Sequence, residues 1–269
     1  MTDGHAAFVA SVPANYDRFL GPLLFHAYAD DLAARLPVAD GMRVLEVACG
    51  TGIVSERLAR RLAGRGTLVA TDLNAAMIDE ARARRGGAAI EWRPADGAAL
   101  PFADASFDAV VCQFGLMFFP DKAAGVREAW RVLRPGGRYL FNVWDAMERN
   151  PVVALTHETA ASFFPADPPN FYTVPYSLHD VAAVRSLLDA AGFVDVACTP
   201  VDARGESPSA ADAAIGLLDG NPIGAAIVQR RADALGEVRA ALTARLAERF
   251  GDRPLRAPLR ALVWTARRS

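Results

Sequence analysis

Short apolar runs alternate along the chain with stretches in which apolar residues recur at helical spacing. Alternation of this kind predicts a parallel sheet with helices on both faces. The apolar runs predict strands at 43–47, 67–71, 90–93, 109–112, 138–143, 194–199 and 259–266. Helical spacing predicts helices at 55–62, 75–85, 123–133 and 178–191. The expected fold is therefore α/β, Rossmann-like and doubly wound.

In the run from Val44 to Gly52, an apolar strand that contains one acid, Glu46, leads into a turn with two glycines. Glycines let backbone N–H groups approach a ligand closely, and a helix that begins at the end of a strand attracts anions. A dinucleotide site would read G-x-G-x-x-G, but Ser55 stands at the third glycine position and Glu46 lies inside the strand. The pattern indicates a nucleotide-type cofactor and disfavours NAD.

A second acid, Asp72, closes the next strand about 20 residues beyond the glycine turn, where a residue that binds a cofactor ribose belongs in such folds. The alternative for Asp72 is a plain helix N-cap.

The run from Val44 to Gly52 resembles the first motif of the class I S-adenosylmethionine-dependent methyltransferases, in which two apolar residues and an acid precede a Gly-x-Gly turn. Further segments match in the family's order, at 71–73, 95–108, 108–114 and 131–141. The resemblance covers roughly residues 43 to 145. It implies a seven-stranded sheet, mostly parallel with an antiparallel edge strand, with S-adenosylmethionine as cofactor and S-adenosylhomocysteine as product.

The resemblance also implies roles for single residues. Asp72 would accept both ribose hydroxyls, Glu46 would orient the loop near the methionine amino group, and Asp96 would bind the adenine amino group. Tyr16 stands where relatives place an aromatic ring over the sulfonium, and packing onto the sheet is its alternative. The implied cofactor-binding residues are Tyr16, Glu46, Ala48, Cys49, Gly50, Gly52, Asp72, Leu73, Met77, Ala95, Asp96, Gly97 and Gln113.

Three segments exceed what the core fold requires. We expect a single methyltransferase domain (1–269) with its core at 37–145 and 178–269. Added to this core are an N-terminal helical cap (1–36), a lid or pocket insertion (146–177) and a helical insertion (206–257). Such segments are expected to determine substrate choice. The last one covers the mouth of the site or forms a homodimer surface. An apolar or aromatic pocket is predicted from Phe19, Phe114, Met117, Phe171 and Tyr172, for which ordinary core packing is the alternative.

Methyl transfer requires mainly an in-line approach of the acceptor, and a base is needed only for some acceptors. Histidine is the side chain best suited to that role near neutral pH. The candidates are His5, His26, His157 and His179, of which we favour His157 because it follows the fifth strand. No metal-ligand spacing is visible.

The net charge of −2 conceals an asymmetry, since residues 230–269 carry ten Arg and four acids. Because the acids are interleaved with the arginines, solvated helix faces are favoured over a nucleic-acid patch. Three scattered cysteines indicate neither a disulfide framework nor a zinc site, and a reducing cytoplasm is expected. The chain shows no signal-peptide pattern and no apolar run of about 20 residues, so no membrane association is expected.

The expected function is methyl transfer from S-adenosylmethionine to a small molecule, with an oxygen, nitrogen or carbon acceptor. One alternative is a cofactor-binding protein of the same fold that acts as a regulator, a partner subunit or a catalyst of another reaction. A nicotinamide oxidoreductase is disfavoured by Ser55 and by the position of Glu46.

Overall fold

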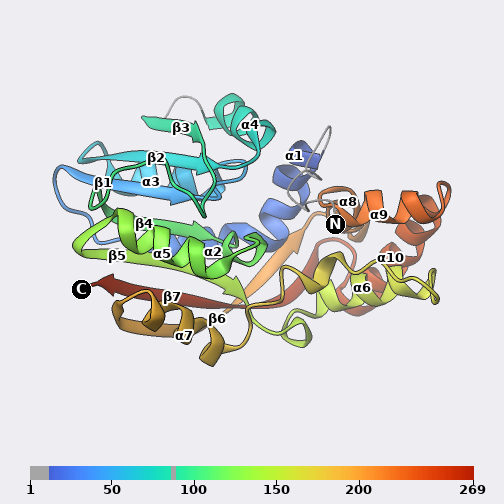
Figure 1. Ribbon diagram of the computed structural model, residues 1–269. Helices are drawn as coiled ribbons and strands as arrows, with labels where there is room; N and C mark the ends of the chain where they lie inside the picture. Colours follow the sequence, from blue (N-terminus) through green and yellow to red (C-terminus); the bar gives the residue numbers. More distant parts are fainter. Residues whose placement is uncertain (1–11, 86–88) are drawn as a thin grey trace. The chain divides into compact units, whose positions relative to one another are not determined.

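The computed structural model describes residues 12–85 and 89–269. Within these residues seven strands form one sheet in the order β3-β2-β1-β4-β5-β7-β6 (Figure 1). Strands β1 to β5 pair in parallel, and β7 pairs antiparallel with β5. The predicted fold class is confirmed. The strands are β1 (Met42–Val47), β2 (Gly66–Asp72), β3 (Ile90–Pro94), β4 (Phe107–Gln113), β5 (Leu133–Trp144), β6 (Phe193–Ser207) and β7 (Leu255–Arg268).

Three ion pairs link β7 to the edge strand β6. They join Arg256 to Glu206, Arg260 to Asp202 and Arg267 to Asp195. Because the residue numbers rise along β7 as they fall along β6, the two strands run antiparallel. Charged side chains along an edge strand also discourage pairing with another chain.

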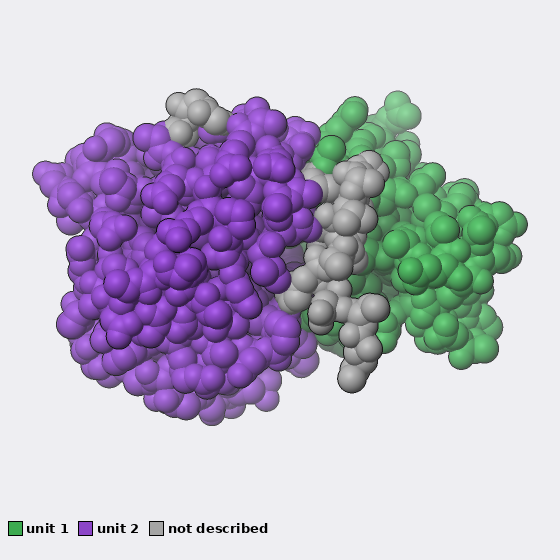
Figure 2. All heavy atoms as spheres, turned by 45° about the horizontal axis from the view of Figure 1, so that its top comes forward, with its two compact units in different colours: residues 1–27, 146–176, 202–260 green, residues 28–145, 177–201, 261–269 purple. Residues whose placement is uncertain are grey.

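The chain divides into two compact units (Figure 2). Unit 1 contains Met1–Ala27, Ala146–Tyr176 and Asp202–Arg260, and unit 2 contains Tyr28–Asp145, Ser177–Val201 and Ala261–Ser269. Unit 1 therefore collects most of the residues that the sequence sets apart from the core. The prediction that core and added segments form one domain stays a prediction.

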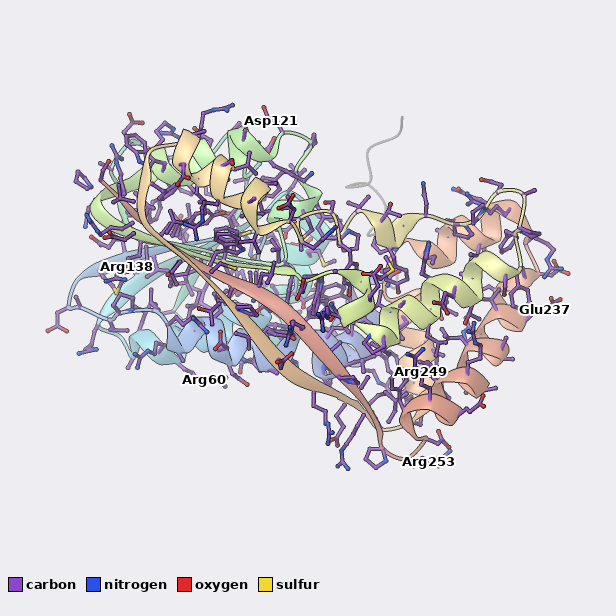
Figure 3. The ribbon with its side chains drawn as sticks, turned by 90° about the horizontal axis from the view of Figure 1, so that it is seen from below. Arg60, Asp121, Arg138, Glu237, Arg249 and Arg253 are labelled. Carbon is purple, nitrogen blue, oxygen red and sulfur yellow. The ribbon has the colours of Figure 1, made fainter. Side chains whose placement is uncertain are left out.

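Unit 2 holds the parallel strands and the helices that cover them. Figure 3 shows α3 (Ile53–Leu62), which carries Arg60, on one face, and α5 (Lys122–Val132), which follows Asp121, on the other. Helices α4 (Ala75–Arg85) and α7 (Val181–Ala190) lie with α3 and α5, respectively. The central strands β1 and β4 are almost wholly buried. Their near-continuous apolar runs are therefore those of strands covered on both faces.

Several helix boundaries differ from the prediction: α3 begins at Ile53 and not at Ser55, α5 begins one residue earlier, and α7 ends one residue earlier. Two further differences have a local reason. Helix α5 ends at Val132, before the predicted Leu133, because Leu133 is already extended (ψ 144°) and begins β5. Pro135 also disfavours helical geometry at Arg134. Helix α7 begins at Val181, three residues later than predicted, because the Asp180 side chain accepts hydrogen bonds from Ala182 N (2.8 Å) and Ala183 N (3.2 Å). A capped N-terminus of this kind fixes where a helix starts.

Unit 1 is helical. Its core helices are α6 (Pro151–Ser162), α8 (Ala210–Asp219) and α10 (Ala234–Phe250), and α10 packs against both others. The π-helix η2 (Tyr16–Phe25) lies against α8, where a Cβ at Gly216 would stand 2.8 Å from Phe19 Cβ. Glycine at position 216 therefore permits this close approach. The other elements of the chain are α1 (Val12–Asn15), α2 (His26–Ala34), α9 (Ile223–Arg230), η3 (Leu116–Phe118), η4 (Met147–Arg149) and η5 (Phe171–Thr173).

The helical periodicity of residues 223–250 corresponds to two helices, α9 and α10. Helical spacing predicts a buried stripe of Ile227, Leu235, Val238, Leu242 and Leu246. All of these are fully buried except Leu235, which is half-buried. Helix α9 ends before Arg231, whose backbone is extended (φ −153°). The buried residues therefore lie on two separate helices.

Eight of the ten arginines at 230–269 form an ion pair with a carboxylate. The guanidinium groups of the other two, Arg249 and Arg268, lie over Phe250 and Trp130. The basic excess of this stretch is thus compensated largely by acids from elsewhere in the chain. Across residues 12–85 and 89–269, none of the helices has the length and apolar character needed to cross a membrane.

We predict that Arg268→Met destabilises the protein by about 2 kcal/mol. Arg268 Nη1 donates hydrogen bonds to the carbonyls of Trp130, Arg131 and Leu133, where α5 ends. Its guanidinium carbon lies 3.8 Å from the centre of the Trp130 ring. Urea denaturation measures the loss. The matched control is Arg267→Met, which removes only an exposed pair with Asp195 and should cost less than about 1 kcal/mol. Equal losses in the two variants would contradict the prediction.

Candidate functional site

The carboxyl ends of the first four strands meet at one edge of the sheet in unit 2. Val47 pairs with Thr71, and Asp72 pairs with Pro94, so β1, β2 and β3 end side by side. A Cβ at Gly97, after β3, would lie 2.8 Å from Val47 Cγ1, and one at Gly115, after β4, would lie 2.5 Å from Ala48 Cβ. The segments that leave these strands therefore converge, and such an edge is where open α/β sheets bind ligands.

The turn after β1 depends on left-handed backbone. Gly50 (φ 55°) and Gly52 (φ 81°) adopt this conformation, as does Ala48 (φ 55°). At Gly52 a Cβ would stand 2.7 Å from Trp92 Cη2, whereas a Cβ at Gly50 would meet nothing within 4 Å. Glycine is thus required at 52 for conformation and space, and at 50 for conformation, with room beside it.

Asp72 ties the end of β2 to this turn. Its Oδ2 accepts a hydrogen bond from Gly50 N (2.8 Å), and its Oδ1 accepts one from Asn74 N (2.8 Å). Asn74, whose Oδ1 accepts from Ala76 N (2.9 Å), is the residue that caps α4. An ionised carboxylate offers about four acceptor positions, and Gly50 N and Asn74 N each occupy one of those of Asp72.

Glu46 lies beneath the turn and is 1% exposed. Burial raises the pKa of Glu46 from its ordinary 4.5 to about 8, the Ser55 side chain lowers it in part, Asp72 raises it further, and Arg85 lowers it. Among the residues that the structure describes, Glu46 Oε2 and Ser55 Oγ are buried and make no hydrogen bond of normal geometry. A buried acceptor without a donor is costly, and a cationic or hydrogen-bonding ligand would satisfy it.

The other predicted cofactor residues differ in exposure. Leu73 is 50% exposed although it is apolar, whereas Cys49, Met77 and Gly97 are buried. Burial, together with the nearby Glu46 and Asp72 carboxylates, raises the pKa of the Cys49 thiol, which therefore stays protonated.

Three predicted residues lie at the ends of β3 and β4. Ala95 N donates to Asp72 O (3.0 Å), and the exposed Asp96 accepts from Ala98 N (2.8 Å). Gln113 Oε1 accepts from Asn142 Nδ2 (3.3 Å). Of the predicted cofactor-binding residues, all except Tyr16 belong to unit 2. Tyr16, in unit 1, stacks on Phe25 with ring centres 4.7 Å apart.

The predicted pocket residues are divided between the units. Phe114 (φ 49°) and Met117 are buried in unit 2, where the Phe114 ring stacks on Trp144 at 3.9 Å. Phe19, Phe171 and Tyr172 belong to unit 1. The Tyr172 hydroxyl donates to Leu217 O (2.6 Å) and accepts from Asn221 Nδ2 (3.1 Å), so it is satisfied within that unit. A substrate role for these five residues stays a prediction.

The candidate bases also stay predictions. His157 is half-buried on α6, and its buried Nδ1 has no hydrogen-bond partner among the described residues. His26 packs on its own turn, with Nε2 2.8 Å from where a Cβ at Gly21 would stand, and His179 is exposed. His5 lies outside the described residues.

Two polar residues near the site escaped the sequence reasoning. Asn142 is fully buried in β5, and its Oδ1 accepts from Phe114 N (3.0 Å), which holds the exit of β4. A single amide within the apolar run 140–144 is a signal that could have found it. Arg85 reaches the glycine turn from the end of α4, and nothing distinguishes it by sequence from the neighbouring Arg82 and Arg84.

The sheet order and the glycine turn with its two acids define a Rossmann-like nucleotide-cofactor domain. A family model described as a methyltransferase domain matches residues 45–141. The ubiquinone/menaquinone biosynthesis C-methyltransferase UbiE of Idiomarina loihiensis is 30% identical over 178 residues, which span 59% of this chain and 69% of that protein. The demethylmenaquinone methyltransferase of Deinococcus radiodurans is 39% identical over 134 residues, 48% of this chain and 55% of the relative. The chain spans 40–53% of the length of several other curated relatives that it matches.

Solved structures agree on the fold. A putative methyltransferase from Bacillus halodurans is similar over 90% of this chain and 99% of its own, with a TM-score of 0.58 and 21% identity. The chain belongs to the class I S-adenosylmethionine-dependent methyltransferase family.

We predict that Glu46→Gln changes how stability depends on pH. In the folded protein the carboxyl keeps its proton up to about pH 8, whereas after unfolding it ionises above about pH 4.5. The stabilisation by the neutral group is therefore complete below pH 4.5 and is lost as the pH rises toward 8. Relative to Glu46→Gln, the free energy of unfolding of the ligand-free wild type should fall by up to about 1.4 kcal/mol per pH unit in this window. Urea denaturation at several pH values measures it, and parallel curves would contradict it.

Proposed function

We propose that the protein transfers a methyl group from S-adenosylmethionine to a small molecule. The observation that carries the proposal is the buried, unpartnered Glu46 oxygen beneath a left-handed glycine turn that Asp72 holds in place. An acidic, buried acceptor suits a ligand with a positively charged amino group. When bound, the cofactor supplies an electrophilic methyl group on a sulfonium, and its thioether product leaves as a neutral group.

The chain's own residues then have distinct tasks. Asp72, at the end of β2 beside the glycine turn, accepts the ribose hydroxyls through its carboxylate. Leu73, apolar and half exposed, provides contact area for the adenine ring, and Asp96 accepts from the adenine amino group. Gly50 gives the ligand close access to the backbone.

The acceptor is proposed to be apolar or aromatic, with Phe19, Phe114, Met117, Phe171 and Tyr172 as the candidate contacts. In-line alignment of the acceptor with the methyl–sulfur bond is the main catalytic requirement, because such positioning removes much of the entropic cost of a bimolecular reaction. Where the acceptor must lose a proton, His157 is the proposed base. The acceptor atom is left open between oxygen, nitrogen and carbon.

The direct test uses purified protein, methyl-labelled S-adenosylmethionine and a metabolite extract of the source organism, with the label followed by mass spectrometry. Label in a small molecule supports the transferase and identifies the acceptor. Tight binding of S-adenosylhomocysteine without any transfer would instead favour the alternative of a non-methylating cofactor-binding protein.

We predict that Leu73→Glu weakens the binding of S-adenosylhomocysteine by about tenfold or more, because it replaces an apolar contact with a charge beside Asp72. Isothermal titration calorimetry measures the dissociation constant. The control is Val194→Glu, an apolar residue of comparable exposure on β6. The wild type should bind S-adenosylhomocysteine in preference to NADH. An unchanged affinity in Leu73→Glu would argue against the adenine contact, and preference for NADH would argue against the cofactor.

A further inference from the structure

Arg85 reaches the glycine turn from the last residue of α4. Its Nη1 donates a hydrogen bond to Thr51 O (2.5 Å), and its Nε lies 3.6 Å from Glu56 Oε2 in the first turn of α3. Its side chain is only 10% exposed, and a Cβ at Gly52 would stand 3.0 Å from Arg85 Cδ. Arg85 thus contacts the carbonyl of Thr51 and the first turn of α3, and its stem fills the space beside Gly52.

Arg85 also carries a positive charge near Glu46. The groups that face Glu46 come from four elements and the turn: Asp72 from β2, Ser55 from α3, Arg85 from α4, Cys112 from β4 and Cys49 from the turn. Asp72 opposes ionisation of Glu46, whereas Arg85 favours it. The two thiols stay protonated because burial raises the pKa of each. Burial is the main reason why Glu46 stays neutral, and Arg85 is the cation that acts against this effect.

We propose that Arg85 is a positioning residue for the cofactor: it fixes the glycine turn through Thr51, and its charge lets Glu46 become an anion beneath a bound ammonium group. The inference rests on the proposed function, because it assumes that the ligand of this turn is a cationic nucleoside. Glu46 then gives up its proton when the ligand binds, and Arg85 sets the pH range in which this happens.

The two parts of the role call for different chemistry. A lysine keeps the positive charge but is a point donor. The planar guanidinium of Arg85 donates a hydrogen bond to Thr51 O from Nη1 and places Nε at ion-pair distance, 3.6 Å, from Glu56 Oε2. A glutamine keeps a donor for Thr51 O but removes the charge. Arg85→Lys and Arg85→Gln therefore separate geometry from electrostatics.

The experiment is titration of the full-length protein with S-adenosylhomocysteine by calorimetry at pH 7 and pH 8, in two buffers of different ionisation enthalpy. Such a pair of buffers gives both the dissociation constant and the number of protons released. The control is Arg84→Gln, because Arg84 is the next residue on α4 and pairs with Glu80 of the same helix.

At pH 8 the wild type should release about half a proton from Glu46, since this pH is close to the pKa of that group. Arg85→Gln should release close to one, because loss of the positive charge raises that pKa further, and should bind about tenfold more weakly. Arg85→Lys should release protons as the wild type does, because the positive charge is kept. It should bind a few-fold more weakly, because the geometry of the guanidinium contacts with Thr51 and Glu56 is lost. The amine of the ligand titrates equally in all variants.

The inference would be overturned if Arg85→Gln released as many protons and bound as tightly as Arg84→Gln. A lower melting temperature of Arg85→Gln would not rescue it, because lower stability alone marks a purely structural residue. If Arg85→Gln did not fold, Arg85→Lys would decide: binding as tight as that of Arg84→Gln would overturn the positioning role. Failure of the wild type to bind S-adenosylhomocysteine would overturn the proposed function instead, so the two failures are distinguishable.

Discussion

The burial of one carboxyl group, that of Glu46, is the constraint on which the site depends. Glu46 lies on β1, between β2 and β4, where solvent cannot reach it. Ionising a carboxyl group in such surroundings is costly, so the group keeps its proton unless a cation compensates it. Asp72 lies near it and accepts two backbone N–H groups. Burial is the main reason why the pKa of Glu46 is raised, and the nearby Asp72 raises it further.

The contact of Asp72 with the turn also explains why the turn is built as it is. Gly50 presents its N–H to Asp72, and Gly52 leaves room for Trp92 and Arg85 because it has no Cβ. Both glycines also have left-handed backbone. The same contacts bring the end of β2 against the end of β1. The conformation of the turn depends on Asp72, and Asp72 also raises the pKa of Glu46. A change in one of these features therefore affects the others.

Features that depend on neighbours in the sequence were predictable. Strands β1 and β4 are apolar runs bounded by turn residues, and the glycine turn follows its strand directly, so each is found where the pattern puts it. Asp72 was found from its distance along the chain, because the length of a βαβ unit varies little. The errors at α5 and α7 are local as well, since Pro135 and Asp180 act within a few residues. The break between α9 and α10 was missed because the buried positions keep helical spacing across it.

Features that depend on distant residues were not predictable. Periodicity indicates that a helix has a buried face, but it does not say what covers that face. Arg85 illustrates the limit: three arginines end α4, and the sequence does not indicate that Arg85 donates to Thr51 O, 34 positions earlier in the chain. Asn142 is similar, because its partners at the exit of β4 are defined only when β4 and β5 pair in register.

A site that holds its acid neutral has a consequence for the ligands it selects. A neutral nucleoside gains little from Glu46, because a protonated carboxyl group is a modest hydrogen-bond partner and its proton need not move. A ligand with an ammonium group gains a charge-assisted hydrogen bond, but only after the proton has left and the charge of Arg85 has offset that of Asp72. For the proposed cationic ligand we therefore expect selectivity to grow as the pH approaches the pKa of Glu46, with Arg85 as the cation that acts against Asp72.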